Sequence, residues 1–167
     1  MSAASAHIRI LQAVSERDIA SARGLIEEYG ASLGINLSFQ HFDEELKSLP
    51  GAYAPPRGAL LLAKAGEECA GCVALRPMTT GICEMKRLYV RSHWRSCGLG
   101  KRLVEAVLDK ARRSKYRAIR LDTLPSMTAA RAMYASFGFR PIPPYCENPI
   151  RGTAFLELDL TRPAFKS

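Results

Sequence analysis

The chain has 167 residues, of which 47% are hydrophobic, and its 24 Lys and Arg against 16 Asp and Glu give a formal net charge of +8 at pH 7. This length fits a single domain over residues 1–167 with enough apolar side chains for a core. The longest apolar run, GALLLA, is far shorter than the ~20 residues of a membrane span, so we expect no membrane partner. Aromatic residues are not interleaved with the basic ones as base stacking requires, so we expect no nucleic-acid partner.

The N-terminal part of the chain is predicted to form one strand and two helices. Its first residues, MSAASAHIRI, have none of the regions of a signal peptide, which predicts a cytoplasmic protein. His7–Val14 alternates loosely as a strand. Ser15 and Asp18 have the spacing of a capping box, and apolar residues follow at helical spacing as far as Gly30–Gly34. A second, short helix is expected at Phe39–Ser48, where it ends before a proline.

Three strands are predicted in the middle of the chain. Ala59–Lys64 and Cys69–Arg76 flank the polar turn AGEE and should form a hairpin. The segment Pro77–Gly81 is expected to break the second strand. Ile82–Val90 then alternates and is predicted to be the central strand of a sheet.

The five cysteines are an odd number, which in a cytoplasmic protein indicates free thiols. Cys69 and Cys72 have the CxxC spacing, which is half of a zinc site, and no second pair follows. Residues three apart on a strand point to opposite faces, so these two sulfur atoms should not converge. The histidines, His7, His41 and His93, share no ligand spacing, and we expect no metal.

The C-terminal part is predicted to alternate helices and strands. A helix at 98–114 and a strand at Ala118–Asp122 follow the central strand, which implies a right-handed parallel crossover. The next helix is expected to be capped by Ser126 and to end at Gly138. Thr153–Leu160 alternates well enough to be the last strand.

A glycine-containing turn at the start of the 98–114 helix is the most informative local feature. Gly98 and Gly100 let the backbone curl tightly, and the unpaired N–H groups of a helix start attract anions, above all phosphate. A Walker loop would need Ser or Thr after the lysine, where the chain has Arg102. A dinucleotide fingerprint would need a third glycine, where the chain has Leu103.

The remaining pattern, Arg95-x-x-Gly98-x-Gly100 after a strand ending at Val90, resembles the pyrophosphate loop of the GNAT superfamily of acyl-CoA-dependent N-acyltransferases. A second segment, ARAMYASFGF at Ala130–Phe139, is similar to the late helix of that family, and both motifs occur in the family's order and separation. The resemblance implies a single N-acetyltransferase domain with a mixed α/β fold. Its central sheet would carry flanking helices in the order β-α-α-β-β-β-α-β-α-β.

The resemblance also implies acetyl-CoA as the co-substrate, bound mostly by backbone groups. The end of the central strand would pair with the pantetheine, and the glycine turn would hold the pyrophosphate. The implied cofactor-binding residues are Leu88, Tyr89, Val90, Arg95, Ser96, Cys97, Gly98, Leu99, Gly100 and Lys101. The Tyr89 side chain should point to the face opposite Leu88 and Val90, into the core. Arg95 would either hold phosphate or brace the turn, and Arg91 and Lys101 are candidates for the 3′-phosphate.

Acetyl transfer needs a base and an acid. An alkyl ammonium of pKa ~10.4 is neutral only about once in two thousand at pH 7, a cost of roughly 4–5 kcal/mol. Glu84 stands where some family members carry a glutamate that acts as base through water, and its simpler interpretation is a salt bridge. Tyr134 stands where the family has its usual general acid for the departing thiolate, and its simpler interpretation is a core aromatic residue.

The acceptor is expected to be a primary amine of a small molecule, and an amino-acid-like acceptor is one form of this hypothesis. Lys86 should share the face of Glu84, whereas strand alternation should turn Arg87 away. The proline-rich loop after the late helix would return near the acceptor, and a carboxylate on the acceptor would then meet Lys86 or Arg151. The expected substrate-binding residues are Lys86, Tyr145, Asn148 and Arg151.

Three alternatives stay open at this point. The chain could acetylate amines of proteins or peptides, it could be a non-catalytic acyl-CoA sensor, or it could be a basic nucleic-acid-binding module. The oligomeric state, homodimer included, is also open.

Overall fold

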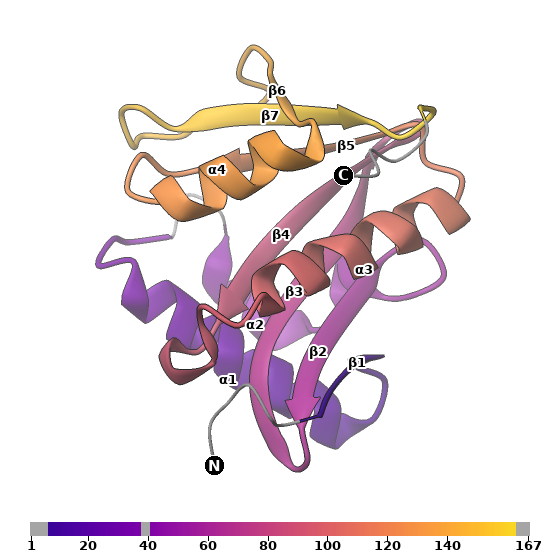
Figure 1. The fold of residues 1–167 in the computed structure, drawn as a ribbon, viewed down its shortest axis with the longest axis vertical. Coiled ribbons are helices and arrows are strands. Elements are labelled where there is room, and N and C mark those ends of the chain that lie inside the picture. The colour runs from indigo at the N-terminus through magenta and orange to yellow at the C-terminus, as the bar shows by residue number, and fades with distance from the viewer. Residues whose placement is uncertain (1–6, 38–40, 163–167) are drawn as a thin grey trace.

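The computed structural model describes residues 7–37 and 41–162, and its centre is a seven-stranded sheet with helices on both faces (Figure 1). Along the chain the strands are β1 (Ile8–Gln12), β2 (Ala59–Ala65), β3 (Glu68–Thr79), β4 (Ile82–Val90), β5 (Ala118–Thr123), β6 (Arg140–Pro141) and β7 (Ala154–Asp159). The helices are α1 (Glu16–Ser32), α2 (Phe42–Ser48), α3 (Leu99–Arg113) and α4 (Thr128–Phe137), with short 3-10 turns η3 (Gly51–Tyr53) and η4 (Ser92–Trp94). The mixed α/β order expected from the sequence is confirmed, with the two-residue strand β6 in addition.

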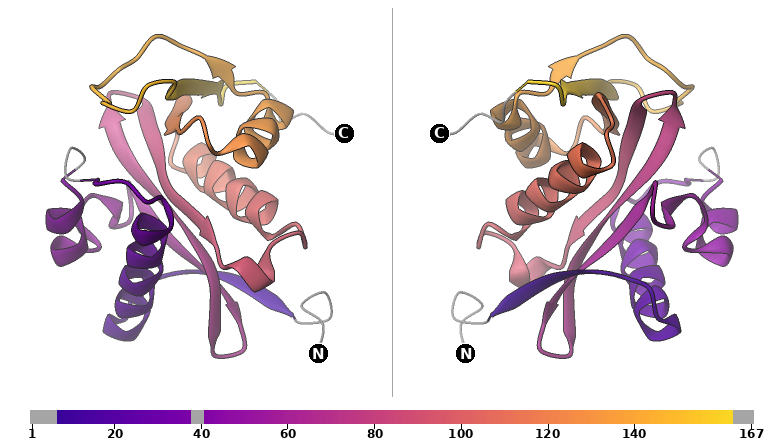
Figure 2. Two further views of the ribbon diagram at one scale, coloured as in Figure 1. Left: turned by 90° about the vertical axis from the view of Figure 1, so that its left-hand side faces the viewer. Right: turned by 90° about the vertical axis from the view of Figure 1, so that its right-hand side faces the viewer.

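Two layers of helices cover the sheet. Seen from the side, α1 and α2 lie on one face, and α3 and α4 lie on the other (Figure 2). On α3 the predicted apolar stripe is buried, and Leu103 and Val107 have no exposed surface. On α1, Leu25 and Ile26 are equally buried against the opposite face. Full burial stabilises by roughly 1.5–3 kcal/mol per large aliphatic side chain, so these stripes determine which face each helix covers.

Local signals for the ends of helices mostly match the structure. The Ser15 side chain accepts a hydrogen bond from the Asp18 N–H at 3.1 Å, as the capping box predicts. Gly138 ends α4 with a left-handed φ of 98°. The prediction that Ser126 caps α4 is wrong, because the Met127 N–H bonds to Leu124 O at 3.0 Å and closes a turn before the helix begins.

Two boundaries differ from the sequence prediction. The predicted break at Pro77 is wrong, because β3 continues to Thr79 with an irregular register at its end. A proline is tolerated in a strand at such an irregularity because its missing N–H is not needed there. The described part of the second helix begins at Phe42, and the predicted start at Phe39 lies outside the described residues.

A β-bulge in the central strand changes which side chains face the acceptor side. The ladder between β3 and β4 shifts register where β4 has an extra residue, and Arg87 there has a left-handed φ of 61°. Lys86 lines the same cavity as Glu84, and Arg87 also reaches this face, where it meets Glu45 of α2. The prediction that alternation turns Arg87 away is therefore wrong, because a bulge resets the alternation.

A second register shift affects the CxxC segment. The pairing of β2 with β3 shifts next to Cys69, and Cys69 and Cys72 both pack against the core cluster beneath α1. The prediction that they point to opposite faces is wrong, because this register shift, like the one in β4, resets the alternation of side chains. Both are free thiols, and burial raises the pKa of the Cys72 thiol to about 12. Residues 7–37 and 41–162 contain no group of three or more His, Cys, Asp or Glu arranged to hold a metal.

The sheet opens between β4 and β5. These strands are parallel and pair only from Ile82 with Ala118 to Glu84 with Arg120. Beyond that point β4 continues to Val90 without a ladder to β5, and Figure 1 shows the two strands diverging. We call this region the fork. One edge of β4 therefore has no neighbouring strand beyond Glu84 among the described residues, and an extended ligand could pair there.

The helices of the described segments include none that combines the length and the apolar content needed to cross a membrane.

Candidate active site

The fork places the end of β4 between two environments. Leu88 and Val90 pack toward the core that α3 covers, and Tyr89 packs toward α1, as alternation after the bulge requires. A small cavity of about 70 Å³ lies in the fork and is lined by Leu88 and Tyr134 among others. An extended ligand lying along β4 would therefore reach Tyr134.

The loop after β4 forms an anion-binding helix start. Ser96 and Gly98 have left-handed φ values of 67° and 80°, and α3 begins directly after Gly98. Arg95 donates from Nε to Val90 O at 2.8 Å, so it braces the turn, which is one of its two predicted roles. A Cβ added at Gly98 would meet no atom within 4 Å, so the space beside the turn is open there, whereas one at Gly100 would contact Met133 Sδ at 3.9 Å and Val90 Cγ2 at 4.0 Å. These features fit a pyrophosphate held by backbone N–H groups.

Two basic side chains near the loop differ in availability. Arg91 bonds to Glu28 of α1 at 2.5 Å and donates to Cys69 O at 2.8 Å. The hydrogen bond from Arg91 lowers the pKa of Glu28. This engagement removes the support for Arg91 as a 3′-phosphate ligand. Lys101 is exposed on the first turn of α3 and stays a candidate.

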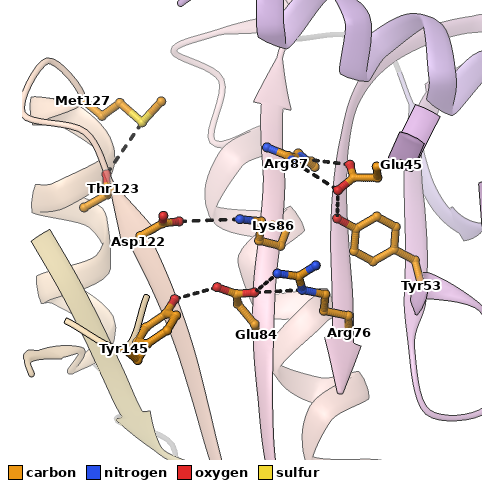
Figure 3. Close-up of polar contacts among 10 residues, drawn as sticks. All are labelled: Glu45, Tyr53, Arg76, Glu84, Lys86, Arg87, Asp122, Thr123, Met127 and Tyr145. Atoms are coloured by element: carbon orange, nitrogen blue, oxygen red, sulfur yellow. Dashed lines mark hydrogen bonds and ion pairs between the residues drawn. The ribbon is translucent and has the colours of Figure 1, made fainter. Parts of the chain in front are cut away.

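Glu84 is an ion-paired, buried carboxylate at the last paired position before the fork. Only 1% of the residue is exposed. Arg76 of β3 contacts its Oε1 through Nη2 at 2.7 Å and Nε at 2.8 Å, and the Tyr145 hydroxyl donates to its Oε2 at 2.6 Å (Figure 3). The salt bridge that the sequence left open is thus present, with a second partner that the sequence did not indicate.

Lys86 and Asp122 face each other across the fork. Lys86 Nζ lies 3.8 Å from Asp122 Oδ1, and both side chains are largely buried (Figure 3). Asp122 lines both the fork cavity and the larger cavity on the α2 side. Like Lys86, it therefore borders both cavities, although no motif in the sequence singled it out.

The third ion pair ties α2 to the bulge of β4. Arg87 donates from Nε and Nη2 to Glu45 at 2.9 and 3.0 Å, and the Tyr53 hydroxyl donates to Glu45 at 2.8 Å. Burial raises the pKa of Tyr53, which keeps its hydroxyl protonated. This network holds α2 as a wall of the larger cavity.

The larger cavity, which we call the acceptor cavity, has a volume of about 450 Å³ and lies on the α2 side of the sheet. Its walls come from α2, η3, the facing ends of β3, β4 and β5, and the segment 145–147. The charged and hydroxyl-bearing side chains among its lining residues are His41, Glu44, Glu45, Ser48, Tyr53, Arg76, Glu84, Lys86, Asp122, Tyr145 and Glu147. Such a volume suits a small ligand.

Two of the four expected substrate-binding residues line this cavity. Lys86 and Tyr145 do, whereas Asn148 and Arg151 are not among its lining residues. Asn148 instead shapes its own loop, because its Oδ1 accepts from the Ile150 N–H at 2.9 Å. Arg151 is exposed. The loop returns to the acceptor side as expected, but only its Tyr145–Glu147 part reaches the cavity.

Tyr134 of α4 lies at the inner end of the fork. Its ring packs edge-on against Phe139 at 5.7 Å, and 6% of the residue is exposed. Burial raises its pKa, so the phenol stays protonated at neutral pH. Within the described part of the chain, no hydrogen-bond partner occupies its hydroxyl. The side chain is thus both packed and available as a donor.

Comparisons with known proteins agree with this geometry. Residues 23–139 match the family model described as "Acetyltransferase (GNAT) family". An uncharacterized N-acetyltransferase of Schizosaccharomyces pombe is 37% identical over 148 residues, which cover 87% of this chain and 91% of the relative. A GNAT-family acetyltransferase from Staphylococcus aureus superposes with a TM-score of 0.76 at 19% identity, covering 92% of this chain and 99% of that one.

A further solved structure, described as an acetyltransferase from Salmonella typhimurium with its cofactor acetyl-CoA, has a TM-score of 0.62 at 18% identity and covers 92% of this chain and 94% of that one. The family model and the S. pombe relative each cover most of the chain. The chain therefore belongs to the GNAT acetyltransferase family and is an N-acetyltransferase.

Proposed function

We propose that this enzyme transfers the acetyl group of acetyl-CoA directly to the primary amine of a small molecule. The observation that carries the proposal is that Lys86 and Asp122 line two cavities at once: the fork cavity beside Tyr134 and the acceptor cavity on the α2 side. A donor lying along β4 and an amine in the acceptor cavity would meet at these two residues.

The donor site rests on backbone groups. The edge of β4 from Leu88 to Val90 that has no ladder to β5 would pair with the pantetheine amides, and the N–H groups at the start of α3 would hold the pyrophosphate. Acetyl-CoA, when bound, supplies the acetyl group as a thioester. The open space beside Gly98 would permit phosphate to approach the helix start.

The chain's own residues would manage the protons. The amine nitrogen forms a bond to the acetyl carbon, the carbon–sulfur bond breaks, the nitrogen loses one proton and the sulfur gains one. Tyr134 is placed to give its phenolic proton to the sulfur. Glu84 is proposed to accept the amine proton through water, while its ion pair with Arg76 and the Tyr145 hydroxyl keep the carboxylate in position.

The size of the acceptor cavity supports a small molecule over a protein or peptide. A volume of about 450 Å³ bounded by α2 on one side and residues 145–147 on the other holds a compact ligand. The amino-acid-like form of the hypothesis has less support, because Arg151 does not line the cavity and Lys86 lies near Asp122.

A thiol-release assay with acetyl-CoA and a panel of small amines tests the proposal, alongside calorimetry with acetyl-CoA alone. We expect micromolar binding of acetyl-CoA and thiol release that requires an amine. Comparing an amino acid with its amide tests the amino-acid-like form, which requires the amide to be the poorer acceptor. Binding of acetyl-CoA with no turnover of any amine would instead favour the non-catalytic sensor. Turnover of peptides but not of small amines would favour the protein-directed alternative.

A further inference from the structure

We propose that the acceptor carries a second positive charge in addition to its reacting amine, as in a diamine. This inference rests on the proposed function and concerns the same acceptor cavity. It reverses the sign expected from the sequence, where Lys86 and Arg151 suggested a carboxylate on the acceptor.

The first argument is that three side-chain donors of the cavity are directed at the protein's own carboxylates. Arg76 and Tyr145 both bond to Glu84, at 2.7 and 2.6 Å. The Tyr53 hydroxyl bonds to Glu45 at 2.8 Å. A substrate carboxylate entering the cavity would compete with these carboxylates for the same donors. It would therefore be repelled by them rather than bound.

Lys86 follows the same pattern. Its ammonium lies 3.8 Å from Asp122 Oδ1, with 7% and 13% of the two side chains exposed. A negatively charged acceptor group beside Lys86 would also lie close to this carboxylate. A positively charged group would instead find Asp122 on the wall.

The second argument is the excess of carboxylates on the wall. Five acidic residues line the cavity, against Arg76 and Lys86 as the lining Arg and Lys residues. Glu44 and Glu147 form no ion pair with any residue of the described segments. They come from α2 and from the loop after Tyr145, so they approach the cavity from two separate walls.

The third argument is the contrast with the rest of the molecule. The chain as a whole has a formal net charge of +8. Its acceptor cavity nevertheless has a lining in which carboxylates outnumber cations. A basic protein with an acidic cavity would concentrate a cationic acceptor there and would keep the anionic CoA on the other side of the fork.

The test compares three acceptors of equal length that differ at one end: 1,5-diaminopentane, 1-aminopentane and 5-aminopentanoate. Each has the same reacting amine, and the far end is positive, apolar or negative. We expect kcat/KM to fall in that order, with at least a tenfold difference between the first and the last. Equal values for the three, or the best value for 5-aminopentanoate, would overturn the inference while leaving the acetyltransferase activity established. If none of the three amines supports thiol release, the proposed function itself is overturned.

Variants locate the effect in the cavity. The double change Glu44→Gln and Glu147→Gln removes two exposed carboxylates, each expected to contribute roughly two- to fivefold. The KM for 1,5-diaminopentane should therefore rise about tenfold, with the KM for 1-aminopentane unchanged. Glu105→Gln, at an exposed position of α3 on the opposite face of the sheet, is the matched control and should change neither value.

A binding measurement supplies a readout independent of turnover. Calorimetric titration of 1,5-diaminopentane into the protein with saturating CoA should show an affinity that falls in the double variant and in high salt. An affinity equal in wild type and double variant would contradict the role of Glu44 and Glu147.

Discussion

Replacing Tyr145 by Phe tests the buried network at Glu84 with a change of one oxygen atom. The hydroxyl donates to Glu84 Oε2 at 2.6 Å, and the carboxylate is almost completely buried. The ring keeps its packing in the variant, because it lies edge-on to Phe155 at 5.1 Å and under the Arg120 guanidinium. The variant therefore removes one charge-assisted hydrogen bond and little else.

The size of the effect follows from the type of bond. A hydrogen bond to a charged group contributes roughly 1.5–3 kcal/mol. Glu84 keeps both contacts from Arg76 and lines a cavity large enough for water, which can replace part of the lost bond. We therefore expect the free energy of unfolding to fall by about 1.5–2 kcal/mol. At roughly 2–4 °C per kcal/mol for a chain of this size, the Tm should fall by about 3–8 °C.

Urea unfolding followed by circular dichroism measures this change. Tyr116→Phe is the matched control, because its hydroxyl donates to the neutral Arg57 O at 2.7 Å and accepts only a long bond of 3.3 Å from Nε of the exposed Arg57, which water can replace. A neutral bond contributes only about 1 kcal/mol, so the control should lose less stability than Tyr145→Phe. Equal losses in the two variants, or none in Tyr145→Phe, would refute the account of Glu84 as a buried carboxylate that depends on this hydroxyl.

Four further predictions follow from the donor site, the proton transfers and the core. Gly100→Asp should lower the affinity for acetyl-CoA, measured by calorimetry, at least tenfold, because it places a carboxylate beside the pyrophosphate. The control Gly24→Asp, in open space on α1, should not lower it, and equal affinities in the two variants would refute the loop assignment. Glu84→Gln should shift the pH–rate profile upward, because an amine without a base must lose its proton unaided, and an unshifted profile would reject the base role. Tyr134→Phe should lower kcat about 100-fold and leave the Kd for acetyl-CoA within twofold, as measured by single-turnover kinetics and calorimetry. A wild-type rate in this variant would contradict the role of Tyr134 as general acid. Leu103→Ala should cost about 2–5 kcal/mol in urea unfolding because the side chain is fully buried, and a loss below 1 kcal/mol would contradict its packing.

Local sequence patterns predicted the elements that carry the donor site. The alternation of Ile82–Val90 predicted β4 with its observed bounds, since alternation over nine residues is a local property of the chain. Gly98 and Gly100 predicted the turn and the start of α3, because backbone conformation there depends on the residues themselves. The two motifs around them also identified the family.

The charge and shape of the acceptor side were decided by tertiary structure. Alternation alone could not show that a left-handed residue at Arg87 would reset the faces of β4, because a bulge depends on pairing with the neighbouring strand. In the same way, Glu84 carries no local sign that Arg76 and Tyr145, 8 and 61 residues away, would be its partners. Such pairings depend on which strands and loops pack together.

The sequence by itself therefore determined the order of the elements, the family and the anion-binding turn, all of which depend on short-range periodicity and on glycine. Only the tertiary structure decided that β4 and β5 separate after Glu84, that Asp122 borders both cavities, and that Arg151 lies outside the acceptor cavity. The physical reason is that ion pairs and cavities are made by side chains from distant segments, whose meeting is governed by the packing of the whole sheet and its helices.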